Sequence, residues 1–207
     1  MNPYETYKTF WEALTVSRET VKELSFFVDK LQKKQIEINL ISRNSSDDFW
    51  LRHVIDSAQL TKFVSRETTS GSDFGSGGGL PGVVLSILNP QIEFKLIESR
   101  AKKAEFLNEV VQEMSLNAKV FHDRIENLTH WKEDLITARA LAPLEKLIPL
   151  LFPFVKNTTT LILPKGKNVQ NEIIAFEKKW SAEIESHKSL TSEEGTILVM
   201  RDLKIKF

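Results

Sequence analysis

Apolar side chains in the first third of the chain follow the spacing of amphipathic helices. They recur every three or four residues through a stretch that is otherwise polar, which gives a helix one buried face. The clearest series is Val21, Leu24, Phe27, Val28 and Leu31. A further helix is expected over residues 48–64, because the run Ser-Ser-Asp-Asp at 45–48 supplies N-cap side chains. We therefore predict a helical extension over residues 1–66.

From residue 67 the pattern changes to short apolar runs that alternate with helical stretches. Such alternation indicates βα units and a mostly parallel sheet. Strands are predicted at 68–74, 93–97, 119–122, 134–137 and 159–163, and helices at 80–88, 101–116, 144–154 and 169–179. The segments 180–190 and 195–203 are predicted to pair as terminal strands. Residues 67–207 are thus expected to form one α/β domain.

The loop after the first predicted strand carries the densest chemical signal. Five of the eight glycines lie within residues 73–82, which read Asp-Phe-Gly-Ser-Gly-Gly-Gly-Leu-Pro-Gly. Glycine adopts positive φ angles and lets a ligand approach the backbone closely. Pro81 suits the first turn of a helix, so the next helix is expected to begin beside the glycines. In doubly wound sheets, nucleotides bind beyond the carboxyl ends of the strands at such a loop.

Two nucleotide-binding patterns fit this loop. Gly77, Gly79 and Gly82 match G-x-G-x-x-G, which with Glu98 would form the dinucleotide site of an NAD(P)-dependent oxidoreductase. The run 73–79 instead matches the acid-x-G-x-G-x-G loop of class I S-adenosylmethionine-dependent methyltransferases, with Glu98 as the ribose acceptor. We favour the methyltransferase pattern, because a carboxylate ahead of the glycines suits an ammonium-bearing ligand and repels a pyrophosphate. The predicted antiparallel strand pair at the chain end is also typical of these methyltransferases.

Composition removes several other classes of protein. The absence of cysteine excludes disulfides, Cys-ligated zinc and a thiol nucleophile. The 28 basic side chains balance 28 acidic ones, so any RNA contact must be local, and DNA binding is not expected. The longest uncharged apolar run, 147–155, is shorter than the ~18 residues of a membrane span, and no secretory signal is evident. We expect a cytoplasmic protein with no membrane partner.

The glycine loop and the segments around it resemble the RsmG (GidB) family, the bacterial 16S ribosomal RNA guanine-N7 methyltransferases. The loop at 73–82 ends with Leu-Pro-Gly, as in the family. The other matching segments, in family order, are Asn39-Leu40, Arg52-His53-Val54-Ile55-Asp56-Ser57, Glu98-Ser99, Lys102-Lys103-Ala104-Glu105-Phe106-Leu107, Arg124-Ile125-Glu126, Thr137-Ala138-Arg139-Ala140 and Lys165-Gly166. The likeness covers residues 39–166, with departures at Ile41 and Pro164.

The resemblance implies a Rossmann-like, seven-stranded, mostly parallel sheet with an antiparallel terminal strand, together with an N-terminal helical extension. It implies S-adenosylmethionine as the methyl donor and a guanine N7 in the 530 loop of 16S rRNA, free or in the small subunit, as the acceptor. It assigns donor contacts to Gly75, Leu80, Ile125, Glu126 and Arg139. The general class I pattern adds Asp73, Gly77 and Glu98. No metal is expected, and the protein is expected to be a monomer.

Residue types that the chain lacks agree with guanine N7 as the acceptor. Methylation of pyrimidine C5 requires a cysteine nucleophile, and the chain has none. Methylation of exocyclic amines usually employs an Asn/Asp-Pro-Pro-aromatic loop after the fourth strand, where residues 137–141 read Thr-Ala-Arg-Ala-Leu. Guanine N7 presents an in-plane lone pair without a proton. Its methylation therefore needs accurate positioning and no general base.

A local basic patch is expected to contact RNA. The candidate cations are Arg52, Lys102, Lys103, Lys165 and Lys167. The alternatives are that these side chains are solvated surface groups and that Arg52 pairs with Asp56 one helical turn away. His53 is expected to be a packed histidine. Methylation of another RNA or a small molecule, and ligand binding without catalysis, stay open as alternative functions.

Overall fold

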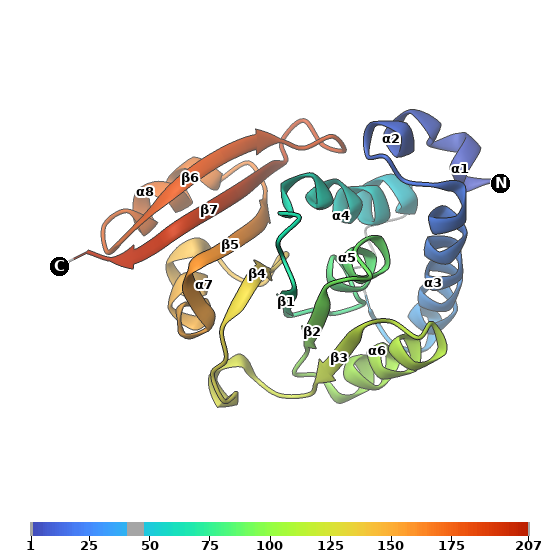
Figure 1. Ribbon diagram of the computed structural model, residues 1–207, viewed down its shortest axis with the longest axis horizontal. Helices are drawn as coiled ribbons and strands as arrows, with labels where there is room; N and C mark the ends of the chain where they lie inside the picture. The colour runs from blue at the N-terminus through green and yellow to red at the C-terminus, as the bar shows by residue number, and fades with distance from the viewer. Residues whose placement is uncertain (1, 41–47, 207) are drawn as a thin grey trace.

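A seven-stranded sheet forms the centre of the molecule, in a computed structural model that describes residues 2–40 and 48–206 (Figure 1). The strand order is β3-β2-β1-β4-β5-β7-β6, with β7 antiparallel to both of its neighbours and the other pairs parallel. The strands are β1 Ser70–Phe74, β2 Glu93–Ile97, β3 Ala118–Phe121, β4 Glu133–Thr137, β5 Val155–Lys165, β6 Trp180–Lys188 and β7 Thr196–Ile205. The predicted fold class is confirmed.

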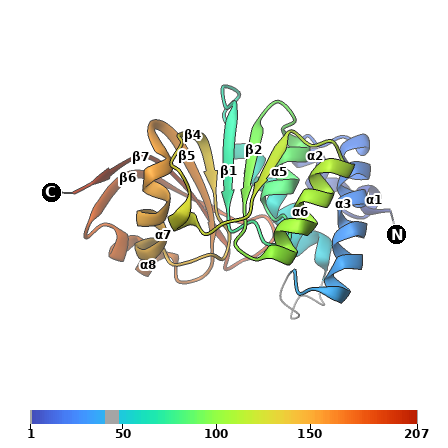
Figure 2. The same cartoon turned by 90° about the horizontal axis from the view of Figure 1, so that it is seen from below.

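Helices cover both faces of this sheet. Successive residues of a strand point to opposite faces, so each strand contributes apolar side chains to the packing on both sides. Leu96 of β2 belongs to a hydrophobic cluster with the helices α3, α5 and α6, whereas Ile97 belongs to a second cluster with α7 and α8. These helices are α3 Arg18–Glu37, α5 Gly82–Leu88, α6 Ala101–Glu113, α7 Leu144–Leu151 and α8 Val169–Phe176. Figure 2 shows the two groups on either side of β1.

The N-terminal helices α1 Pro3–Thr6, α2 Lys8–Ala13 and α3 pack on the core of the sheet domain. Trp11 and Leu24 are fully buried in the same cluster as Phe94 of β2. The helical extension is therefore joined to the sheet by a continuous apolar core. The boundary predicted near residue 67 stays a prediction, and β1 begins at Ser70.

The single helix predicted over residues 48–64 is wrong in its form. The chain instead makes a π-helical turn η1 Trp50–Ile55, a short α4 Asp56–Ala58 and a 3-10 turn η2 Gln59–Phe63. The Ser57 hydroxyl donates to the carbonyl of His53 at 2.6 Å, a side-chain bond that competes with regular helical bonding. Asp48 does cap this segment, since it accepts from Leu51 N–H at 3.1 Å. The other predicted capping residues, at 45–47, and Ile41 lie outside the described residues.

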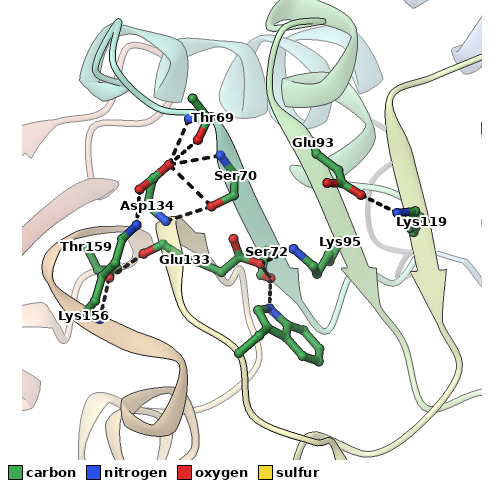
Figure 3. Close-up of polar contacts among 11 residues, drawn as sticks. Thr69, Ser70, Ser72, Glu93, Lys95, Lys119, Glu133, Asp134, Lys156 and Thr159 are labelled. Atoms are coloured by element: carbon green, nitrogen blue, oxygen red, sulfur yellow. Dashed lines mark hydrogen bonds and ion pairs between the residues drawn. The ribbon is translucent and has the colours of Figure 1, made fainter.

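Polar side chains hold the central strand β1 in place at its amino end (Figure 3). Asp134 of β4 accepts from the backbone N–H groups of Thr69 and Ser70, at 2.9 and 3.1 Å. The Ser72 hydroxyl donates to the buried carboxylate of Glu133 at 2.8 Å. These bonds explain how a strand with little apolar content occupies the middle of the sheet.

No helix in the part of the chain that the structure describes has the length and hydropathy needed to cross a membrane.

Candidate active site

The glycine loop lies at the carboxyl edge of the sheet, between the end of β1 and the start of α5. Its backbone N–H groups at Gly75 and Ser76 both donate to the carbonyl of Ile97 at 2.9 Å, which ties the loop to the end of β2. Gly75, Gly77 and Gly79 have φ angles of 75°, 57° and 90°. Side chains rarely adopt this region, which explains the glycines at these three positions.

Asp73 supports the loop from beneath. Its side chain is 0% exposed; Oδ1 accepts from the Thr137 hydroxyl at 2.7 Å, and Oδ2 accepts from Gly82 N–H at 3.1 Å. Burial raises the pKa of this carboxyl above its usual range. A Cβ at Gly82 would lie 2.6 Å from Oδ2, so the close contact requires glycine there. The structure thus places Asp73 under the loop, bonded to Thr137 and Gly82, and its contact with the donor stays a prediction.

Glu98 fastens the loop from the side. Oε2 accepts from Gly77 N–H at 2.9 Å and Oε1 accepts from Arg100 N–H at 2.8 Å, and the residue is 6% exposed. Each carboxylate oxygen has a second lone pair, so the carboxylate can still accept a ribose hydroxyl. The ribose contact stays a prediction. The structure shows in addition that Glu98 holds the glycine loop through its hydrogen bond to Gly77 N–H.

A cavity of about 200 Å³ opens beside the loop. Three of the predicted donor residues, Gly75, Ile125 and Glu126, line it together. The other lining residues are Ile97, Ser99, Asp123, Arg124, Leu141 and Leu150. An apolar wall with a few polar groups suits a planar heterocycle such as adenine. The side chain of Leu80, by contrast, is 5% exposed and packs in the hydrophobic core, so only its backbone is available to a ligand.

A second cavity, of about 1000 Å³, adjoins the first. Four segments of the chain form its walls, at 48–56, 139–143, 164–172 and 189–197. Leu141 lines both cavities, and its side chain lies over Gly75, where an added Cβ would come within 2.9 Å of it. Leu141 therefore lies between the two cavities, next to the glycine loop.

Arg139 lines the larger cavity. One guanidinium nitrogen donates to Asp56 Oδ2 at 3.3 Å, and the side chain is 17% exposed. Thr191, on the turn between β6 and β7, donates its hydroxyl to the same carboxylate at 2.8 Å. Sequence reasoning did not identify Thr191 or Leu141, because no motif marks them and the fold alone brings them to this edge.

His53 lies on the π-helical turn beside this group and is a packed residue, as expected. Its ring stacks edge-on against Phe49, with centroids 5.1 Å apart, and neither ring nitrogen has a hydrogen-bond partner among the described residues. Burial, with the nearby positive charge of Arg139, lowers the pKa of His53 to about 4. The imidazole is therefore neutral at neutral pH.

The predicted RNA-binding cations divide into two groups. Lys103 donates to the carbonyl of Leu40 at 3.0 Å, and burial lowers the pKa of its amine. Lys165 has a side chain only 9% exposed, and its amine lies 2.9 Å from both the Ala142 carbonyl and Glu172. Both amines are engaged by groups of the protein, which argues against RNA contact by these two lysines, and their assignment stays a prediction.

The remaining predicted cations have exposed side chains. Lys102 and Lys167 are exposed, and neither makes a hydrogen bond or ion pair within the described ranges. Arg52 is exposed as well and lines the larger cavity. RNA contact by these three side chains stays a prediction.

Comparisons with known proteins agree with this site. Residues 20–200 match the GidB family model, described as rRNA small subunit methyltransferase G. The chain is 40% identical over 194 residues to the ribosomal RNA small subunit methyltransferase G of Cereibacter sphaeroides, covering 92% of this chain and 94% of that protein. It is 38% identical to the protein of the same name from Zymomonas mobilis, covering 89% and 86%.

Solved structures with much lower identity share the fold. The mitomycin 7-O-methyltransferase MmcR superposes with a TM-score of 0.62 at 14% identity, covering 93% of this chain and 67% of that one. TYW2 of M. jannaschii in complex with AdoMet superposes with a TM-score of 0.56 at 15% identity, covering 78% and 80%. These likenesses show the fold alone. The family match over residues 20–200 is what supports the methyltransferase pattern of the glycine loop over the dinucleotide pattern. The chain belongs to the GidB family, rRNA small subunit methyltransferase G, and is an rRNA methyltransferase with S-adenosylmethionine as its methyl donor.

Proposed function

We propose that this protein transfers the methyl group of S-adenosylmethionine to N7 of a guanine in the 530 loop of 16S rRNA. The observation that carries the proposal is the pair of cavities that Leu141 lines in common, one beside the glycine loop and one large enough for a nucleotide. A methyl group held at their junction would face an acceptor in the larger cavity.

The smaller cavity suits the adenosine part of the donor. Ile97, Ile125 and Leu150 offer apolar surface to the adenine ring, while Glu98 lies at the loop for the ribose. Gly77 leaves the backbone open to close approach, since no atom beyond its chain neighbours lies closer than 3.8 Å to an added Cβ there. Arg139 would face the far end of the donor from the larger cavity. The residues present therefore fit the group that the family uses.

S-adenosylmethionine supplies, when bound, a methyl group activated by a positively charged sulfur. The N7 lone pair would form the new bond to that carbon while the bond to sulfur breaks, and no proton moves at N7. The carboxylates of Asp56 and Glu172 in the larger cavity accept hydrogen bonds from protein donors. The proposed reaction needs no general base, because N7 carries no proton. Positioning alone can supply about 7 kcal/mol or more to such a step.

RNA would be held by a few local charges, because the chain carries no net charge. Arg52 lies on the wall of the larger cavity, and Lys167 follows the wall residue Gly166. Lys102 lies in the first turn of α6, next to the glycine loop in the fold. Contacts to the RNA backbone at these points would orient the target base without reading its sequence.

The test combines binding and transfer. Calorimetry should show binding of S-adenosylhomocysteine and no binding of NADH. Incubation with radiolabelled S-adenosylmethionine should then label small subunits from a strain lacking this activity, and Arg139→Ala should label them poorly. Tight S-adenosylhomocysteine binding with label only on another RNA or a small molecule would overturn the proposed acceptor. Binding with no transfer to any acceptor would indicate a binding protein without catalysis.

A further inference from the structure

Asp56 is the central residue of a side-chain network on the wall of the larger cavity. Its Oδ1 accepts from the Thr191 hydroxyl at 2.8 Å and from the Gln59 amide at 2.9 Å. Its Oδ2 accepts from Arg139 at 3.3 Å. The carboxylate thereby joins the N-terminal segment, the end of β4 and the turn between β6 and β7. Figure 1 shows this turn reaching across to α4.

Gln59, one helical turn after Asp56, also binds the turn between β6 and β7. It is 1% exposed, and its side-chain oxygen accepts from Leu190 N–H at 2.8 Å. Its amide nitrogen also donates to the Ser189 hydroxyl at 3.1 Å. A residue of the N-terminal segment thus binds the backbone of a turn more than a hundred residues later. Two adjacent side chains, at 56 and 59, fix this wall of the cavity.

The orientation of the Arg139 guanidinium depends on its hydrogen bond to Asp56. Asp56 is the only acceptor that hydrogen-bonds the Arg139 guanidinium among the residues described. One contact uses a single donor of the five that a guanidinium offers, so the others stay available to a ligand in the cavity. The next residue, Ala140, has a φ of 52°, which turns the chain sharply after β4. Without the carboxylate, nothing described would hold the guanidinium against this wall.

We propose that Asp56 is a positioning residue for methyl transfer, acting through Arg139. The inference rests on the proposed function, because it assigns Arg139 to the reacting end of the site. Asp56 does not touch the donor or the target base in this account. It fixes the guanidinium and, with Gln59, the turn that closes the cavity.

A double-mutant cycle tests this assignment. The four proteins are wild type, Asp56→Asn, Arg139→Ala and the double variant, and the readout is the single-turnover rate of methyl transfer to saturating under-modified small subunits. Asn keeps the size and the acceptor oxygen of Asp56 but removes its charge, so the fold should survive. Glu193→Gln is the matched control, since Glu193 is an exposed carboxylate on the same turn with no partner described.

The expected result is a rate at least about 10-fold lower for Asp56→Asn. The same substitution should cause no further loss once Arg139 is Ala, and Glu193→Gln should match wild type. A wild-type rate for Asp56→Asn, or losses that multiply independently of Arg139, would overturn the proposal. If wild-type protein does not label the subunits, the proposed function fails instead. The same four proteins are then compared by their affinity for S-adenosylhomocysteine. An equal loss of affinity in both single variants and the double variant supports the role of Asp56. No loss in Asp56→Asn, or a loss in the double variant equal to the product of the two single losses, refutes it.

Discussion

Lys165 and Lys167 illustrate how neighbouring residues of one type take different roles. The two lysines flank Gly166 at the end of β5, and sequence alone makes them equivalent candidates for RNA contact. In the fold the Lys165 amine points inward to Ala142 and Glu172, whereas Lys167 extends into solvent. The residue types predicted positive charge at the end of β5. They did not predict that the Lys167 side chain is exposed and the Lys165 side chain is not.

Separate alanine substitutions should therefore have opposite effects. Lys165→Ala should lower the free energy of unfolding by about 1–3 kcal/mol, because it leaves the Ala142 carbonyl and Glu172 without their partner. Lys167→Ala should leave stability unchanged, weaken RNA binding and reduce the slope of log K against log salt by about one. Urea unfolding and binding titrations at several salt concentrations measure both. Loss of RNA affinity in Lys165→Ala at full stability would contradict the assignment.

His53 should make the protein sensitive to acid in a defined range. Its pKa is about 4 in the folded protein and near 6.5 in the unfolded chain, so between these values the unfolded chain binds more protons. Folding stability should therefore fall as pH drops from 6.5 towards 4. His53→Leu should flatten this part of the stability profile, while the control His122→Leu, at an exposed position, should not. Thermal unfolding across this pH range distinguishes them, and an unchanged profile in His53→Leu would refute the role.

The glycine loop is the element whose chemistry was most readable from the sequence. The location of the loop and the type of its ligand were predicted from the spacing of the glycines, from the acid before them and from the proline after them. The structure adds the reason for particular members, since Gly82 makes room for the buried carboxylate of Asp73. A glycine elsewhere, Gly166, has no atoms within 4 Å of an added Cβ.

Alanine substitution at Gly82 and at Gly166 should have different effects on stability, because only Gly82 is closely packed. Gly82→Ala should cost about 1–3 kcal/mol, because the new methyl group would overlap Asp73 and Leu96. It should also weaken S-adenosylhomocysteine binding, as the loop shifts. Gly166→Ala should stay within about 0.5 kcal/mol of wild type. Urea unfolding and calorimetry provide the comparison, and equal stability in the two variants would argue against the close packing described.

Sequence patterns predicted the order and type of nearly all strands and helices in the sheet domain. They failed at residues 48–64, where apolar spacing fits a regular helix but the Ser57 side chain and packing produce three different turns. They also could not place the β6–β7 turn beside Asp56. That contact joins residues 135 positions apart, and no local pattern encodes it.

At the scale of the whole molecule, the candidate site lies along one edge of a sheet that is packed by two apolar clusters. The N-terminal helices pack in the same core as the strands, and their continuation forms a wall of the larger cavity. Charge is balanced overall, so the proposed RNA contact would depend on local cations such as Arg52, Lys102 and Lys167 and not on a bulk field. The larger cavity, proposed to hold the acceptor, is thus built by parts of the chain that are far apart in sequence.

The most direct test maps the methylated atom. Small subunits from a strain lacking this activity are incubated with the protein and S-adenosylmethionine, and the rRNA is then cleaved by chemistry specific for N7-methylguanine. The account predicts one new cleavage site, at a guanine of the 530 loop in 16S rRNA, which Arg139→Ala reduces strongly. Methyl transfer to a different atom or nucleotide, with the 530 loop unmodified, would contradict it.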